Sequence, residues 1–376
     1  MDLSPLIAIV KTLFTPLWVG CVASLLLSLL VVLTTRWHGF LSLDESAGVQ
    51  KVHAHPTPRV GGLPMVLGLV IAVWAGPNEL RDQTWPWLLA AIPAFAFGLA
   101  EDLTKRVGVI QRLLATMASG VLAWAITGYA VTVANVWGLD WLLQFTVVSV
   151  LFTAFAVGGM ANAINIIDGL NGLASSMVLW ALLGMATLAA SLGDTVLAST
   201  CLLLAACVLG FFVVNWPFGK LFLGDGGSYF LGFALSWACV LLVERHDSMT
   251  AFAALLICIH PVAEVFYSVY RRKMRHQNPG HPDRLHFHSL VKRRIMQRLM
   301  PHSSKTLRNS MGGLLVGGMS LLPAVLVQFV YSSTLACMAA VLALSMGYVW
   351  LYKRMVVRLK GVTDVSLPLK PSVLDR

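Results

Sequence analysis

The sequence predicts an all-α, polytopic membrane protein with about eleven transmembrane helices, and three observations support this. Of its 376 residues, 57% are hydrophobic and only 12% are charged, which is about half the usual charged share of a soluble domain. The charged residues are separated by long uncharged stretches, and Lys and Arg are unevenly divided between alternate loops. Too few polar residues remain to cover a soluble enzyme, and the hydrophobic content excludes a disordered chain.

The uncharged stretches are long enough to cross a bilayer, which takes about 20 mostly apolar residues. Ten stretches of 16 to 44 residues occur, and the last is long enough for two helices that turn near Tyr331, Ser332 and Ser333. We therefore expect eleven spans in a single domain over residues 1–376. The first has no basic leader and no small-residue cleavage site, so we interpret it as a helix that is retained. The stretches lie between residues 11 and 36, 59 and 79, 82 and 101, 112 and 140, 140 and 168, 168 and 194, 194 and 220, 225 and 244, 247 and 264, and 308 and 353.

The distribution of basic residues predicts the orientation. Of the 27 Lys and Arg residues, 24 fall in alternate loops and in the C-terminal tail, and this side should face the cytoplasm. The N-terminus is then outside and the C-terminus inside. Five segments share the cytoplasmic face and form the expected active-site loops: 36–61, 101–112, 161–172, 216–226 and 271–309.

The net charge of +10 could indicate a nucleic-acid partner, but its position between apolar stretches is better explained by topology. We expect no nucleic-acid binding. The six cysteines lack the spacing of a zinc site, and we assign them no function.

Four carboxylates lie where the expected helices meet the cytoplasm, namely Glu101, Asp102, Asp168 and Asp225. One acidic residue at a helix end is usually a solvated terminus. Four on one face, beside an excess of cations, instead favour a site for a metal ion and a diphosphate, because Mg²⁺ prefers carboxylate oxygens and substrate phosphates.

The segment 162–173, with the sequence NAINIIDGLNGL, carries two amides and a carboxylate at three-residue steps. Residues so spaced share one helix face, and unpaired amides at membrane depth cost free energy. A plain helix C-cap at Gly169 explains the segment less well than a polar site.

Three further loops are less specific on their own. The segment 222–228, FLGDGGS, is typical of a glycine-rich turn entering a helix, where backbone N–H groups can face a phosphate while Asp225 holds a metal; an ordinary cap is the alternative. The loop 271–309 holds eleven basic residues and the stretch HPDRLHFHS, whose His and Arg side chains suit an anionic diphosphate. The segment 51–62, KVHAHPTPRVGG, combines cations with stiffening prolines.

Taken together, these residues resemble the polyprenyl-phosphate N-acetylhexosamine-1-phosphate transferases, also called glycosyltransferase family 4. The resemblance runs from about Lys51 to Ser289 and is most specific for the NxxNxxDGxxGL and GDxGS motifs. The DRxHxH loop is more similar to the UDP-N-acetylglucosamine branch than to the phospho-N-acetylmuramoyl-pentapeptide branch.

The resemblance implies roles for individual residues. Glu101, Asp102 and Asp168 would be catalytic, and the metal ligands would be Asp225, Asp102 and Asp168, with Phe222 stacking on uracil. The substrate-binding set would be Lys51, His53, Thr57, Arg59, Asn165, Asn171, Phe222, Asp283, Arg284, His286 and His288.

This chain departs from the family pattern at three positions. Glu101 replaces the usual first Asp and lengthens the side chain by a methylene. Asn171 stands where many members have a second Asp, so it cannot act as a base or a nucleophile. Ser289 replaces a third His.

The resemblance also implies a reaction and its setting. A UDP-N-acetylhexosamine, expected to carry N-acetylglucosamine, would give its sugar 1-phosphate to undecaprenyl phosphate, leaving UMP, with Mg²⁺ or alternatively Mn²⁺ as cofactor. The product would start an envelope polysaccharide such as O-antigen at the cytoplasmic face of the bacterial inner membrane, amid membrane lipid.

Several alternatives stay open from the sequence. Another UDP-N-acetylhexosamine, a covalent enzyme intermediate in place of direct attack, and a homodimer are all compatible with it. A secondary transporter is the rival class, but transporters place ionisable residues near the bilayer midplane. Here that region holds one polar cluster, formed by His260, Pro261 and Glu264.

Overall fold

A computed structural model describes residues 3–44, 56–276 and 285–360, and the backbone alone at residues 44 and 357–360. It is all-α apart from one pair of two-residue strands, in which β1 (Leu43–Asp44) pairs antiparallel with β2 (Thr57–Pro58). This confirms the predicted class of a polytopic all-α membrane protein.

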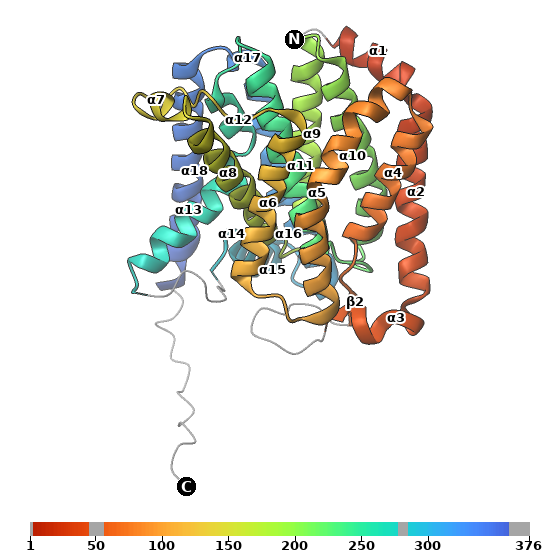
Figure 1. Cartoon of the computed structure of the whole chain (residues 1–376). Helices are drawn as coiled ribbons and strands as arrows, with labels where there is room; N and C mark the ends of the chain where they lie inside the picture. The colour runs from red at the N-terminus through yellow and green to blue at the C-terminus, as the bar shows by residue number, and fades with distance from the viewer. Residues whose placement is uncertain (1–2, 45–55, 277–284, 361–376) are drawn as a thin grey trace.

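Nine helices or joined helices in the described ranges are long and apolar enough to cross a membrane. They stand side by side as a bundle in Figure 1. Their bounds are α2 (Phe14–Leu33), α5 (Asn78–Thr104), α6 (Val109–Thr127), α8 (Thr146–Ile167), α9 (Leu173–Ser191), α10 (Thr195–Asn215), α11 (Gly224–Arg245), α18 (Thr334–Lys360), and the run of α16 (Lys305–Gly317), the 3₁₀ turn η2 (Gly318–Ser320) and α17 (Leu321–Val330).

Two of the eleven expected spans take a different form. The ninth is broken into α12 (Ala251–Ile257) and α13 (Ile259–Lys273), which meet at 81° and count as a tenth span if joined. Pro261 lies in the first turn of α13, where its missing N–H costs no helical hydrogen bond. The second expected span is α4 (Gly62–Ala75), which has only 14 residues. The expected number of eleven therefore stays a prediction, whereas the expected turn near Tyr331 lies between α17 and α18.

The remaining elements are short and lie at the two ends of the bundle. In Figure 1 the upper end carries the N-terminus and α7, and the lower end carries α3, β2, α14 and α15. Their bounds are α1 (Ser4–Thr12), α3 (Thr35–Ser42), α7 (Leu139–Leu143), α14 (Phe287–Val291), the π turn η1 (Lys292–Met296) and α15 (Gln297–Leu299).

Helix α11 forms the centre of the bundle and packs against both α5 and α8. Nearly all of its side chains are buried, from Gly224 to Leu242. A helix that is apolar all round is stable only when protein or lipid surrounds it. Its first turn, which contains Asp225, is therefore fixed by the packing of the whole bundle.

Candidate active site

The candidate site is centred on the carboxylate of Asp225 in the first turn of α11. Its Oδ1 accepts hydrogen bonds from Arg59 at 3.2 Å and from Asn165 at 2.9 Å, and its Oδ2 is paired with the guanidinium of Arg112. These partners come from the loop before α4, from α8 and from α6. Asp225 is only 5% exposed, and burial strengthens such charge-assisted contacts.

Asp102 holds the start of α11 from the last turn of α5. Its Oδ1 accepts from the backbone N–H of Asp225 and its Oδ2 from that of Gly226, both at 2.9 Å. A carboxylate is favourable at a helix N-terminus, because it satisfies free N–H groups and the positive end of the dipole. A side chain of the protein therefore occupies these two N–H groups, and the expectation that N–H groups of this turn face a phosphate stays a prediction for the other N–H groups of the turn.

The backbone at Gly224 explains why the turn before Asp225 needs glycine. Its φ is +75°, and a Cβ there would overlap the carbonyl oxygen of Arg59. The segment is tied to the first loop by three backbone hydrogen bonds, from Phe222 N to Pro58 O at 2.8 Å, from Gly61 N to Phe222 O at 2.9 Å and from Gly62 N to Leu223 O at 3.0 Å. The GDGGS and TPRVGG motifs therefore form one structural unit, which contains half-buried Phe222 and buried Thr57.

Asp168 ends α8 as its C-cap residue and lies within electrostatic reach of the central cluster. Burial raises the pKa of its carboxyl group to about 7; the guanidinium of Arg59 lowers it and the charge of Asp225 raises it further. A pKa near neutrality lets this group exchange a proton or gain charge when a cation approaches.

Glu101 and Asn171, although in the expected loops, make contacts that differ from those of the central cluster. Glu101 Oε2 accepts from the backbone N–H of Val107 at 2.8 Å and so stabilises the turn between α5 and α6. Asn171 is 3% exposed; its N–H donates to Asn309 Oδ1 at 2.8 Å and its Nδ2 to Ser310 Oγ at 3.0 Å. Both contacts of Asn171 are to α16.

The histidine loop reaches the site through His288. Its ring stacks on His286 at 5.5 Å between centroids and lies against Gly169, where a Cβ would overlap its Nε2. Burial lowers the pKa of His288 to about 4, so the ring is neutral near pH 7. Lys51, His53, Asp283 and Arg284 lie outside the described residues.

Two features of the site were missed by the motif analysis. Arg112 was counted only as a topological cation. Its position directly before an expected span, in the same expected loop as the acidic pair Glu101 and Asp102, is nevertheless a usable signal. Glu264 and Tyr348 contact the histidine loop from regions without a family motif. Their signal is an acid inside an expected span and a Tyr in the mostly apolar part of α18.

Within the described ranges, no group of three or more His, Cys, Asp and Glu side chains is gathered closely enough to hold a metal ion alone. Two carboxylates with substrate phosphates are nevertheless a usual Mg²⁺ donor set. Asp225 and Asp168, which influence each other electrostatically, fit that set. Both oxygens of Asp102 accept from backbone N–H groups of α11, which cannot turn away as the side-chain partners of Asp225 can, and this makes Asp102 the weakest candidate of the three predicted ligands.

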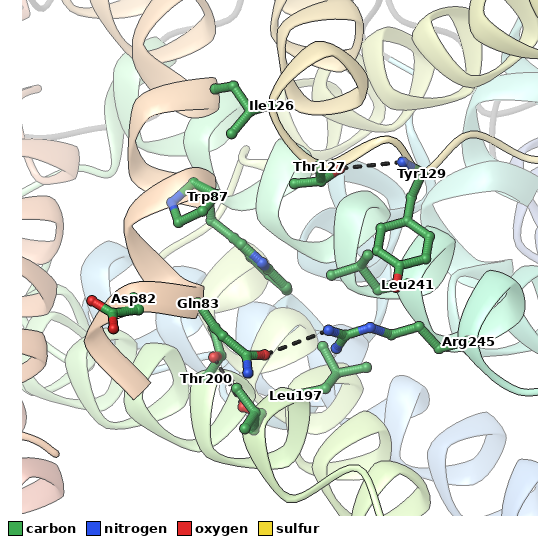
Figure 2. Close-up of a pocket in the computed structure, with 12 residues that line it drawn as sticks. Asp82, Gln83, Trp87, Ile126, Thr127, Tyr129, Leu197, Thr200, Leu241 and Arg245 are labelled. Carbon is green, nitrogen blue, oxygen red and sulfur yellow. Dashed lines mark hydrogen bonds between the residues drawn. The ribbon is translucent and has the colours of Figure 1, made fainter. Parts of the chain in front are cut away.

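A separate cavity of about 200 Å³ lies at the opposite ends of α5, α6, α10 and α11. Figure 2 shows Arg245 reaching Gln83 beside Trp87 and Tyr129 in this cavity. Asp82 in its lining is twenty residues before Asp102 on α5, which corresponds to roughly 30 Å along a helix. The cavity is therefore distinct from the carboxylate cluster.

Comparison of the sequence with those of known proteins identifies its relatives. The model of glycosyl transferase family 4 matches residues 84–243. The chain is 30% identical over 279 residues to an undecaprenyl-phosphate α-N-acetylglucosaminyl 1-phosphate transferase of Thermotoga maritima, covering 74% of this chain and 81% of that protein.

Two other relatives cover smaller shares. A probable undecaprenyl-phosphate N-acetylglucosaminyl 1-phosphate transferase of Bacillus subtilis is 29% identical over 64% of this chain and 66% of its own length. A phospho-N-acetylmuramoyl-pentapeptide-transferase of Moorella thermoacetica is 32% identical over 49% of this chain and 61% of its own length. With its membrane bundle and its buried carboxylate cluster, the chain belongs to glycosyl transferase family 4.

Proposed function

We propose that the protein transfers N-acetylglucosamine 1-phosphate from UDP-N-acetylglucosamine to undecaprenyl phosphate, giving undecaprenyl-diphosphate-N-acetylglucosamine and UMP. The observation that carries this proposal is the cluster around Asp225, in which one buried carboxylate meets Arg59, Arg112 and Asn165 from three other segments. The names of the Bacillus subtilis and Thermotoga maritima relatives support the donor sugar and the lipid acceptor.

The chemistry is a displacement at phosphorus. A free oxygen of the lipid phosphate attacks the β-phosphorus of the donor, the bond from that phosphorus to the bridging oxygen breaks, and UMP leaves with the electron pair. Such reactions depend mostly on positioning and on neutralising charge. Arg59 and Arg112 are placed to bind the diphosphate oxygens, because an anionic substrate can compete with Asp225 for their guanidinium groups.

Mg²⁺ or Mn²⁺ is the proposed cofactor, and Asp225 and Asp168 would hold it together with oxygens of the substrate diphosphate. When bound, such a cation supplies charge neutralisation at the diphosphate. Asn165, at 2.9 Å from Asp225 Oδ1, orients this carboxylate. Asp102 holds the first turn of α11, and Glu101 holds the adjacent loop through Oε2. Either would orient the lipid phosphate through acceptor sites that these bonds leave open.

The donor end of the site is proposed to be the histidine loop with Phe222. His288 is neutral near pH 7 because its pKa is lowered to about 4, so it contributes a hydrogen bond rather than a charge. His286, Lys51, His53 and Arg284 would add contacts to the sugar diphosphate, while Phe222 would stack on the uracil.

We favour direct attack by the lipid phosphate over a covalent enzyme intermediate. Asn171 cannot serve as a nucleophile, and its amide is bonded to α16. Asp168 is then the main carboxylate left for a covalent route. Direct attack predicts no exchange of labelled UMP into the UDP-sugar without lipid phosphate; exchange that is lost in Asp168→Asn would contradict it.

The proposed setting is the bacterial inner membrane, with the site on the cytoplasmic face. A sugar diphosphate on a lipid carrier is the starting unit of an envelope polysaccharide, and O-antigen is the class that we favour. A measurement of the mass of the protein in detergent would show whether it is a homodimer.

The decisive experiment is an assay of the purified protein with undecaprenyl phosphate and a panel of UDP-sugars, in which UMP is measured. We expect release with UDP-N-acetylglucosamine, loss of release in Asp225→Asn, and loss in excess EDTA that Mg²⁺ or Mn²⁺ restores. Release with a different UDP-N-acetylhexosamine alone would reassign the donor. Full activity in excess EDTA would overturn the proposed cofactor.

A further inference from the structure

A buried carboxylate outside the proposed catalytic cluster holds the histidine loop in place. Glu264, in α13, is 1% exposed. Its Oε1 lies 2.9 Å from His286 Nδ1, and its Oε2 accepts from the hydroxyl of Tyr348 at 2.8 Å. The backbone N–H of Phe287, the first residue of α14, lies 3.3 and 3.2 Å from the two oxygens. One side chain therefore satisfies three donors and caps a helix that its own N-cap residue leaves without a side-chain bond.

The same short segment is anchored a second time at its start. The carbonyl oxygen of Leu285 accepts from Arg271 and from the hydroxyl of Tyr352, both at 2.8 Å. Tyr348 and Tyr352 are one turn apart on α18, so they face the same neighbour. The ring of Phe287 packs at 5.2 Å from that of Tyr348. Residues 285–287 are thus fixed between α13 and α18.

This anchoring extends to the candidate active site through His288. The next residue after Phe287 is His288, whose ring stacks on that of His286 with an angle of only 11° between planes. On its other side His288 lies against Gly169, which directly follows Asp168. We therefore expect a displacement of His286 to shift His288, because the two rings are stacked and one residue separates them along the chain.

We propose that Glu264, supported by Tyr348, is a positioning residue that sets the His286–His288 segment for binding of the UDP-sugar donor. The inference rests on the proposed function for the identity of that donor. Glu264 itself contacts no reacting atom. A carboxylate is required because it offers acceptor sites on both oxygens, whereas an amide offers one acceptor and one donor group. In Glu264→Gln, one of the three donors loses its partner, and a buried donor without a partner destabilises its segment.

The test combines kinetics with hydrogen exchange. In Glu264→Gln we expect the KM for UDP-N-acetylglucosamine to rise on the order of 10-fold, with the KM for undecaprenyl phosphate unchanged. Amide exchange in the peptide 285–291 should become faster. Tyr348→Phe removes one hydroxyl and keeps the ring, so it should fold well and show a smaller change in the same direction. Glu264→Asp keeps the charge and should recover part of the donor affinity.

Glu244→Gln is the matched control, because Glu244 bonds to Thr132 at the other end of the bundle. It should leave both the donor KM and the exchange at the wild-type values. Unchanged exchange in Glu264→Gln, or an unchanged donor KM in folded protein, overturns the inference. A wild-type protein that releases no UMP with any UDP-sugar would refute the proposed function instead. The exchange comparison would then still decide whether Glu264 holds the segment.

Discussion

At the scale of single residues, charge is concentrated where the bundle ends. Asp225 shares its two oxygens among two arginines and an amide, and Asp102 faces Arg59 at 3.7 Å. Arg59 therefore lies between the two carboxylates and offsets their mutual repulsion. When a diphosphate enters, the same guanidinium groups can turn their N–H groups from the carboxylate to phosphate oxygens. Carboxylates and phosphates are both anions that accept hydrogen bonds from a guanidinium group.

Arg112→Ala should lower kcat/KM for the donor by roughly 10- to 100-fold, since a hydrogen bond to a charged group is worth about 1.5–3 kcal/mol. Arg112→Lys should recover only part of the lost kcat/KM, because an ammonium group lacks the bidentate geometry of a guanidinium group. Arg106→Ala is the control, since Arg106 is exposed in the α5–α6 loop that precedes the helix of Arg112. UMP release measured over a range of donor concentrations checks this. Equal kcat/KM in the two Ala variants would remove Arg112 from the site.

His288 should make the protein less stable in mild acid. Its pKa is about 4 in the folded protein and near 6.5 in an unfolded chain. Between these values the unfolded chain binds more protons, so stability falls as the pH drops from about 6.5 to 4. The full effect amounts to roughly 3 kcal/mol. The thermal midpoint in detergent should therefore fall more between pH 7 and pH 5 in the wild type than in His288→Gln. Equal falls in both proteins would show that His288 is not buried as a neutral ring.

The motifs predict part of the site but not how its residues are held. Asp168, Asp225, Arg59 and Asn165 could be identified from spacing and resemblance, because such motifs are local in sequence. The pairing of Arg112 with Asp225 spans 113 residues and that of Glu264 with Tyr348 spans 84. Such pairings depend on which helices are neighbours, and hydrophobic spacing carries no information on that.

At the scale of helices, the site depends on how closely α5 approaches α11. Gly98, one turn before Asp102, lies against the backbone of α11, where a Cβ would be 2.7 Å from the carbonyl oxygen of Asp225. Small residues let helix backbones approach closely in membranes. This approach brings Asp102 under the first turn of α11.

Gly98→Ala should therefore push the two helices apart and lower kcat, because a misplacement of about 1 Å can cost on the order of 10²-fold in rate. Gly159→Ala is the matched control, since a Cβ at Gly159 on α8 meets nothing within 4 Å. Kinetics and thermal midpoints of both variants check this. The prediction fails if Gly98→Ala keeps the wild-type kcat.

Charge-free stretches predict where helices lie better than they predict their shape. The interval from residue 247 to 264 indicates one span, yet the chain there forms α12 and α13 with a sharp bend. The interval from 59 to 79 contains only the short α4. Hydrophobicity fixes which residues avoid water, whereas Pro261, Gly76 and the packing of neighbouring helices decide where a helix begins and ends.

At the scale of the whole molecule, residues from all five expected active-site loops meet at one end of the bundle. Arg59, Arg112, Asn165 and Asp225 are in contact, and His288 lies against Gly169. This end is the lower one in Figure 1. The predicted eleven spans place an even number of crossings between consecutive loops of this set and so put all five on one side, while the number of spans itself stays a prediction.

The last prediction concerns which side of the membrane this end faces. The distribution of Lys and Arg, 24 of 27 on one side, predicts the cytoplasm. Arg106, in the α5–α6 loop, is exposed, and Trp137, before α7, is fully exposed at 100%. In intact cells, a membrane-impermeant thiol reagent should label Trp137→Cys but not Arg106→Cys, and it should label both after the membrane is opened.

The native cysteines provide a low background for this experiment, because five of the six are buried and Cys21 is half-buried within α2. A cytoplasmic reporter fused after Arg376 should be active as well. Labelling of Arg106→Cys in intact cells would show that the bundle has the opposite orientation in the membrane. A site that faces away from the cytoplasm would have no access to a UDP-sugar, because nucleotide sugars carry at least two negative charges and charged groups cross a bilayer only at high free-energy cost. The topology measurement therefore tests the proposed reaction as well as the orientation.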